Sequence, residues 1–291
     1  MLRRALTVAG DYLELCKPRI AILLLITTFA AMMMAARGLP SLPLIIWTLL
    51  GGALASFSAG AFNCVYDADI DALMRRTCER PIPTGKISRF NATIFAIVLG
   101  LIAFALLYFL VNPLAAWLSL AGNLYYVFVY TMWLKRRTPL NIVIGGAAGS
   151  VPPLVGWAAV TGHVGAPAIG LFVLIFLWTP PHFWALSLFS ESDYEKAGIP
   201  MLPNVSGEER TKREIISYTI IMVLASLLLY PMQIMGIPFF IAASLLGAWF
   251  IVGALRTWQD ATTVSARKLF RYSLVYLALI CVAMVIDRLV A

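Results

Sequence analysis

Long apolar runs constrain this chain more than any other feature of its sequence. A helix needs about 20 mostly apolar residues to cross a bilayer, and nine runs of about that length follow one another between short polar segments. The composition agrees, because 61% of the 291 residues are hydrophobic and only 12% are charged, about half the charged share of a soluble domain. We therefore predict an all-α polytopic membrane protein with nine transmembrane helices. The runs lie at residues 20–36, 44–62, 90–111, 114–134, 140–160, 168–188, 215–235, 237–255 and 270–289.

The positive residues indicate how the predicted helices are oriented. A formal charge of +8 could point to nucleic acid, but all of the 22 lysines and arginines except Arg37 and Arg288 lie in segments that an alternating chain places on one side. This asymmetry is typical of the cytoplasmic side of a membrane protein. We expect a cytoplasmic N-terminus, a C-terminus outside, no nucleic-acid partner, and a place in the cell inner (plasma) membrane.

The order of the segments indicates a weak internal duplication inside a single membrane domain, residues 1–291. Two apolar runs, an acidic loop, two more apolar runs and a basic loop occupy about residues 17–137. The same order returns at about residues 138–268, and a ninth run follows.

The acidic loop after the second run carries Asn63, Asp67 and Asp71 at intervals of four. On a helix these side chains share one face. A solvated helix end that happens to be acidic is one interpretation, but carboxylates at a membrane border are costly and usually functional. Oxygen ligands with this spacing suit Mg²⁺, which also binds phosphate oxygens.

A second acidic loop, with Glu191, Asp193 and Glu195, follows the sixth run on the same predicted side. The two loops together hold half of the 14 acidic residues, which solvated loops do not explain. Two carboxylate clusters with arginines and lysines nearby predict a site for a diphosphate held through Mg²⁺. A diphosphate that leaves an allylic cation also needs apolar walls and aromatic faces around that cation.

His182 follows Pro180 and Pro181, which we expect to break the sixth membrane helix. A buried, hydrogen-bonded histidine and a ligand or acid–base group are both open interpretations. The four cysteines form no C-x-x-C pair, so neither a zinc site nor a disulfide framework is predicted.

Together these segments resemble the protoheme IX farnesyltransferases (haem O synthases), a family of UbiA-type intramembrane prenyltransferases. The resemblance rests on Asn63-x-x-x-Asp67-x-x-x-Asp71 and on residues 17–20, 67–83, 130–149, 152–157, 179–184 and 193–203. It implies Mg²⁺-dependent transfer of the farnesyl group of farnesyl diphosphate to a vinyl group of haem B. Addition of water then gives haem O, and diphosphate is released.

The resemblance also implies roles for single residues. In one departure, Ala197 stands where the wider superfamily has a second aspartate four residues after Asp193. Either Glu195 or another group takes its place, or a second metal is held more weakly. The implied catalytic and metal-binding residues are Asn63, Asp67, Asp71 and Asp193. The implied diphosphate contacts are Arg75, Arg80, Lys135 and Arg137. The implied haem or prenyl pocket contains His182, Tyr130, Asn141 and Trp184. Implied partners are the lipid bilayer and, for assembly, haem A synthase or a terminal oxidase.

We expect His182 to belong to the haem pocket and not to the diphosphate site, because eleven residues separate it from Asp193. A helix running on would place them roughly 16 Å apart. A prenyltransferase for a phenolic or quinone precursor is the nearest alternative, since its metal site would be the same. A cation-coupled transporter is another, although transported ions bind near the midplane and these carboxylates lie at the predicted ends of the helices.

Overall fold

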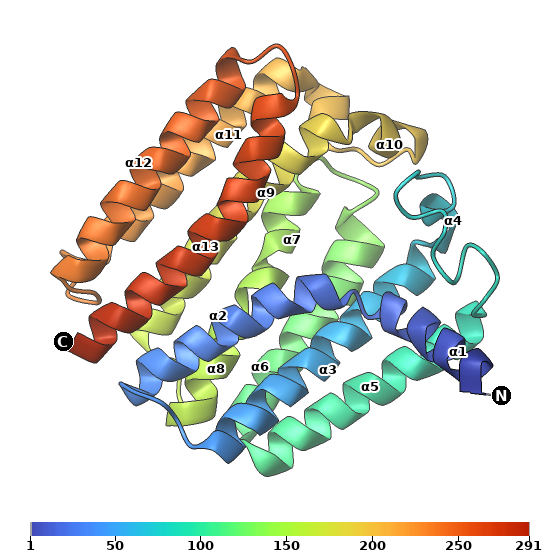
Figure 1. Cartoon of the computed structure of the whole chain (residues 1–291), viewed down its shortest axis with the longest axis horizontal. Coiled ribbons are helices and arrows are strands. Elements are labelled where there is room, and N and C mark those ends of the chain that lie inside the picture. The colour runs from blue at the N-terminus through green and yellow to red at the C-terminus, as the bar shows by residue number, and fades with distance from the viewer. Residues whose placement is uncertain (1, 291) are drawn as a thin grey trace.

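The computed structural model describes residues 2–290, and within them every regular element is a helix (Figure 1). The prediction of an all-α membrane protein is confirmed. The helices are α1 (Leu2–Leu15), α2 (Pro18–Ala36), α3 (Leu42–Tyr66), α4 (Ala68–Asp71), α5 (Arg89–Leu110), α6 (Pro113–Leu124), η1 (Tyr125–Leu134), α7 (Asn141–Ser150), α8 (Pro152–Thr161), α9 (Ala166–Phe189), α10 (Glu191–Lys196), α11 (Leu202–Leu228), α12 (Ile237–Gln259) and α13 (Val264–Val290).

Eight helical stretches among the described residues are long and apolar enough to cross a membrane. Two of them combine consecutive elements, α6 with η1 and α7 with α8. The remaining predicted run, residues 215–235, falls on α11, whose first half is charged and whose last residue is Leu228. α11 lies along α12 nonetheless (Figure 1). The count of nine spans and the orientation of the termini therefore stay predictions.

Local chemistry explains where several helices begin. The Ser88 hydroxyl accepts a hydrogen bond from the Asn91 N–H (3.1 Å) at the start of α5. The Asn112 side chain accepts one from the Ala115 N–H (2.9 Å) at the start of α6, where Pro113 holds the first helical position. Both contacts satisfy N–H groups that a helix leaves unpaired at its first turn.

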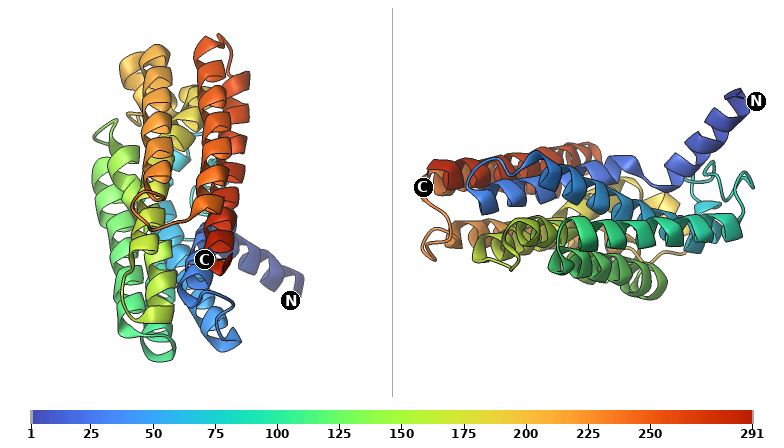
Figure 2. Two further views of the ribbon diagram at one scale, coloured as in Figure 1. Left: turned by 90° about the vertical axis from the view of Figure 1, so that its left-hand side faces the viewer. Right: turned by 90° about the horizontal axis from the view of Figure 1, so that it is seen from below.

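The helices pack as a bundle that leaves α1, α4 and α10 near one end (Figures 1 and 2). One large apolar core joins α9, α11, α12 and α13. α8 approaches α2 at Gly156, where an added Cβ would lie only 2.2 Å from the Thr28 carbonyl oxygen. α4 and α10 occupy matching places, one after α3 and the other after α9. The internal duplication remains a prediction.

The prediction that Pro180 and Pro181 break the sixth membrane helix is wrong. α9 continues through both prolines as far as Phe189. Proline removes one backbone donor, but buried side chains on both sides of the pair, among them Trp178 and Trp184, pack α9 into its neighbours. The chain departs from the helix instead at Ser190, so no continuous helix joins His182 to the second acidic loop.

Candidate active site

The first acidic segment keeps its four-residue spacing through the end of α3. The Asp67 N–H donates to the Asn63 carbonyl (2.9 Å), and the Asp71 N–H donates to the Asp67 carbonyl (2.7 Å). The side chains of Asn63, Asp67 and Asp71 are buried, whereas Asp69 is exposed. The helical face predicted from the sequence is therefore present.

Two lysines meet the Asn63–Asp67 pair. The Asn63 amide donates to Asp67 Oδ2 (2.8 Å), and its oxygen accepts a hydrogen bond from Lys17 Nζ. Lys135 Nζ pairs with the same Asp67 oxygen. Lys17 stands between α1 and α2 with a left-handed backbone (φ 51°), and burial lowers the pKa of its ammonium group to about 8. A half-buried lysine with a left-handed backbone is typical of a binding site.

A wide helical turn brings the second set of cations to the site. η1 is a π-helix, and the Lys135 N–H donates to the Tyr130 carbonyl (2.9 Å), five residues back. Each turn takes in about one residue more than in an α-helix, so residues four and five positions after Thr131 share its face. Thr131 accepts from the Asn63 amide (3.1 Å), and Lys135 and Arg136 both reach carboxylates.

Arg136 is a site residue that sequence reasoning missed. Its guanidinium donates two hydrogen bonds to Asp69, both of 2.7 Å, and lies 4.8 Å above the Tyr66 ring. The hydrogen bond from Arg136 holds the pKa of Asp69 at about 2. Arg137, which the resemblance proposed, is exposed and makes no ion pair with any described carboxylate. The prediction of Arg137 as a contact of this site is therefore not supported by its place in the structure.

The other predicted cations differ in position. Arg80 pairs with Asp71 (2.7 Å), beside the buried face of the segment. Arg75 is exposed, as is Arg76, and no ion pair to either is present among the described side chains. Lys17 carried a signal in the sequence, since it precedes the first span in a Lys-Pro-Arg segment, but nothing in the sequence aims its side chain at Asn63.

The second acidic segment lies against the first. Tyr194 of α10 packs with Ile70, which lies inside the first segment, and with Met74, which follows it, in one buried apolar cluster. This packing brings together two segments more than 100 residues apart in sequence. Asp193 and Glu195 are partly to fully exposed, and neither forms an ion pair with a described residue.

Negative charge in the second segment is not balanced. Burial raises the pKa of Glu191, and the carboxylates of Glu208 and Glu195 raise it further. A divalent cation would offset this repulsion. Ala197 packs at the edge of the buried cluster around Tyr194. Its methyl side chain supplies no ligand in place of the absent aspartate.

The donors of the first segment fit Mg²⁺. Asp67 Oδ1 is buried and accepts no hydrogen bond, and Arg136 Nη2 lies 3.7 Å away from it. An unsatisfied buried carboxylate oxygen is costly, and an oxygen ligand set without sulfur or imidazole suits a hard cation. The residues described form no ready-made group of three or more acidic, histidine or cysteine ligands; Asn63 and the substrate's phosphate oxygens would have to complete the shell.

His182 lies apart from the carboxylates. Its ring is stacked between Trp178 (centroids 4.2 Å apart) and Phe270 (4.6 Å). Its Nδ1 is 2.6 Å from Ser273 Oγ, and that hydroxyl donates to the Phe270 carbonyl (2.7 Å). These contacts fit a histidine that donates from Nδ1 and has a lone pair on Nε2, with the serine hydrogen directed to the Phe270 carbonyl.

The remaining predicted pocket residues do not form one group. Tyr130 packs beside the acidic segments, where Gly145 makes room, since a Cβ there would lie 2.2 Å from the ring. Asn141 is buried and donates to the Thr138 carbonyl (2.6 Å), which ties down the loop after η1. Trp184 is also buried, but its ring faces Tyr218 of α11 (5.2 Å). Trp184 thus has a different neighbour from the other predicted pocket residues, His182, Tyr130 and Asn141.

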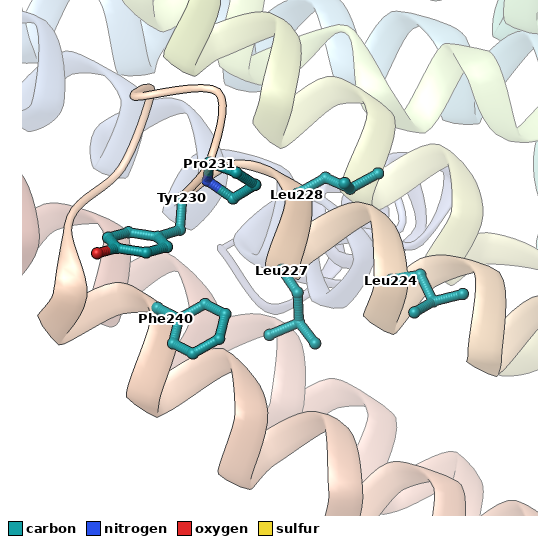
Figure 3. Close-up of a pocket in the computed structure, with 6 residues that line it drawn as sticks. All are labelled: Leu224, Leu227, Leu228, Tyr230, Pro231 and Phe240. Carbon is teal, nitrogen blue, oxygen red and sulfur yellow. The ribbon is translucent and has the colours of Figure 1, made fainter.

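Two hollows on the molecule do not coincide with these residues. A hollow of about 510 Å³ lies where α11 turns into α12 and is lined only by apolar and aromatic side chains and Pro231 (Figure 3). A second, of about 290 Å³, lies between α3, α5 and α6. Neither is lined by a carboxylate or a cation, so neither offers the chemistry of the acidic segments.

Comparisons with known proteins identify the family of this chain. Residues 24–280 match the UbiA prenyltransferase family. The chain is similar to proteins named protoheme IX farnesyltransferase, with 52% identity to that of Gloeobacter violaceus over 96% of this chain and 92% of the other. The Synechocystis protein of that name is also 52% identical, over 97% and 90%. The relative from Chloroflexus aurantiacus is 49% identical over 98% of this chain, which spans only 48% of that longer protein.

Solved structures show the same fold. A digeranylgeranylglyceryl phosphate synthase superposes with a TM-score of 0.80 over 98% of this chain and 100% of that one, at 19% identity. A UbiA homologue from Archaeoglobus fulgidus, bound to DMAPP and Mg²⁺, has a TM-score of 0.63 at 17% identity and covers 94% of this chain and 99% of that one. With the family match over most of its length, the chain belongs to the UbiA prenyltransferase family.

Proposed function

We propose that this protein transfers the farnesyl group of farnesyl diphosphate to a vinyl group of haem B, giving haem O and diphosphate. The observation that carries the proposal is the buried Asn63–Asp67–Asp71 face with four cations around it and a second acidic segment packed alongside. Relatives named for this activity, about half identical over nearly the whole chain, support the choice of substrates. The assignments of metal-binding, diphosphate-binding and haem-pocket residues given below are part of the same proposal.

The residues around the carboxylates perform the diphosphate half of the reaction. Asn63, Asp67, Asp71 and Asp193 would hold Mg²⁺, which neutralises the diphosphate as it leaves. Lys17 and Lys135 now contact Asn63 and Asp67, so they are placed to move onto phosphate oxygens once a metal takes those ligands. Donors aimed at charge that develops on a leaving group stabilise the transition state more than the ground state.

The histidine and its neighbours belong to the acceptor half. A free Nε2 lone pair with Nδ1 fixed by Ser273 is the form of histidine that ligates a metal, and imidazole is a usual ligand of haem iron. The two stacked rings hold the imidazole in place. We therefore assign His182 to the haem pocket.

A phenolic or quinone acceptor would use the same carboxylates, so the acceptor half decides between the two. His182 favours haem, because a phenol needs no metal ligand. The same proposal places the protein in the cell inner membrane, with haem A synthase or a terminal oxidase as partners in assembly.

Pigment analysis tests the proposed function. Membranes from cells that lack haem O and express this chain are extracted, and haems are separated by mass and retention. We expect haem O with the wild-type chain and only haem B with the Asp67→Asn variant at equal protein level. Haem B alone in both samples, together with a prenylated phenol or quinone, would show that the acceptor is wrong.

A further inference from the structure

Four aromatic rings and one arginine form a row from α9 to α13, and this row is not part of the carboxylate site described above. Trp178 stacks on His182, His182 on Phe270, and Phe270 meets Phe189 edge to face (5.8 Å). The Arg267 guanidinium lies 5.3 Å above the Phe189 ring. The row therefore leads from the buried middle of α9 to the exposed first turns of α13.

This row borders the acidic segments through one residue. Phe183 touches the His182 ring edge to face (5.4 Å) and also packs in the apolar cluster of Ile70 and Tyr194. The acidic segments therefore border the row at Phe183, and Arg267 stands at the end of the row on α13.

Arg267 carries a positive charge that the protein does not balance. It is exposed, and among residues 2–290 no carboxylate lies within ion-pair distance of it or of Arg271, one turn later. Arg213 makes a comparable stack on Trp258 (5.9 Å) but is also paired with Glu209 (3.4 Å). The aromatic contact holds the Arg267 side chain in place and leaves its N–H fork free for an anion.

We propose that Arg267 binds a carboxylate of the acceptor while the aromatic row receives its flat apolar ring. The inference rests on the proposed function and adds an orientation to it. Haem B carries both propionates on one edge and both vinyl groups toward the opposite side. With the propionates at Arg267, the vinyl side faces Phe183 and the carboxylates, where the prenyl cation forms.

Absorption titrations of the purified full-length protein test this assignment. Haem B and its dimethyl ester, which lacks the propionate charges, are titrated into the wild type and into Arg267→Gln. We expect Arg267→Gln to weaken haem B binding about tenfold, because a charge-assisted contact is lost, and to leave ester binding unchanged. Arg267→Lys should recover part of the affinity, since it restores charge without the fork. Arg213→Gln is the matched control and should bind haem B like the wild type.

The outcomes separate this inference from the function beneath it. Equal haem B affinity in wild type and Arg267→Gln, or an equal loss for haem B and ester, overturns the role of Arg267. The role is also overturned if Arg267→Gln weakens the binding of farnesyl thiodiphosphate with Mg²⁺ as much as it weakens the binding of haem B. The arginine would then serve the diphosphate side or the fold. If the wild type makes haem O and Arg267→Gln binds haem B as the wild type does, only the inference fails. If the wild type makes no haem O, the proposed function fails together with the inference.

Discussion

The two acidic segments touch each other but are prepared for a metal in different ways. In the first, Asp67 and Asp71 are buried and each is already paired with a cation, Lys135 or Arg80. In the second, Asp193 is only partly buried and has no described cationic partner. The first segment is therefore already paired with cations, whereas in the proposed site only a bound metal and substrate would neutralise the second. The predictions below separate these two halves.

Asp67→Asn should have the largest effect. The change keeps the volume of the side chain but removes the charge that Lys135 and Arg136 share and one metal ligand. We expect farnesyl transfer to fall by at least about 10²–10³-fold, measured as haem O formed by purified protein. Thermal unfolding in detergent is the control for folding. Turnover within tenfold of the wild type would contradict a central role for the first segment.

Asp193→Ala should lower the rate of farnesyl transfer less, by about tenfold at limiting Mg²⁺. The reason is that this carboxylate completes the second half of the site only when a cation is present. Raising Mg²⁺ should recover much of the loss. The matched control is Glu209→Ala, which removes an exposed charge outside both acidic segments. A loss as deep as that of Asp67→Asn, unaffected by Mg²⁺, would mean that the two halves are equally preassembled.

Arg136→Gln and Arg137→Gln test which arginine serves the first segment. Arg136 forms a fork with Asp69 and approaches Asp67, so its loss should raise the KM for farnesyl diphosphate several-fold. Arg137 is exposed, and we expect its variant to stay within about twofold. The reverse ranking would restore the role implied for Arg137 by family resemblance.

Asp69→Ala should have the smallest effect. Asp69 is exposed and paired only with a partly exposed arginine, and such pairs contribute about 0–1 kcal/mol. We expect turnover within about threefold of the wild type and little change in the melting temperature. Equal losses for Asp67, Asp69 and Asp71 variants would show that the segment has no distinct buried face.

The sequence predicts the first acidic face well, because four-residue spacing on a helix needs no tertiary information. It predicts only part of the set of cations at that face: Arg80 and Lys135 reach it, whereas Arg136 was missed. The π-helical turns of η1 bring Lys135 and Arg136 around together and leave Arg137 outside, and a wide turn leaves no mark in hydropathy. The left-handed backbone of Lys17 is hidden for the same reason.

Tertiary packing also overrides two local signals. Pro180 and Pro181 read as a helix break, yet the packing of α9 carries it through both prolines. The apolar run at residues 215–235 reads as one span, but α11 begins earlier, with a charged stretch and a kink at Gly207, and ends at Leu228. The first difference comes from packing contacts that a single sequence does not record, and the second reflects the glycine kink and the charged residues that precede the apolar run.

The central claim is that both acidic segments form one Mg²⁺-dependent diphosphate site, and calorimetric titration of farnesyl thiodiphosphate tests it most directly. We predict tight binding to the wild type with Mg²⁺ and little with a chelator, no Mg²⁺-dependent binding to Asp67→Asn, and a higher Mg²⁺ requirement in Asp193→Ala. Equal affinity with Mg²⁺ and with chelator would show that the lysines and arginines bind the diphosphate alone, which contradicts the claim.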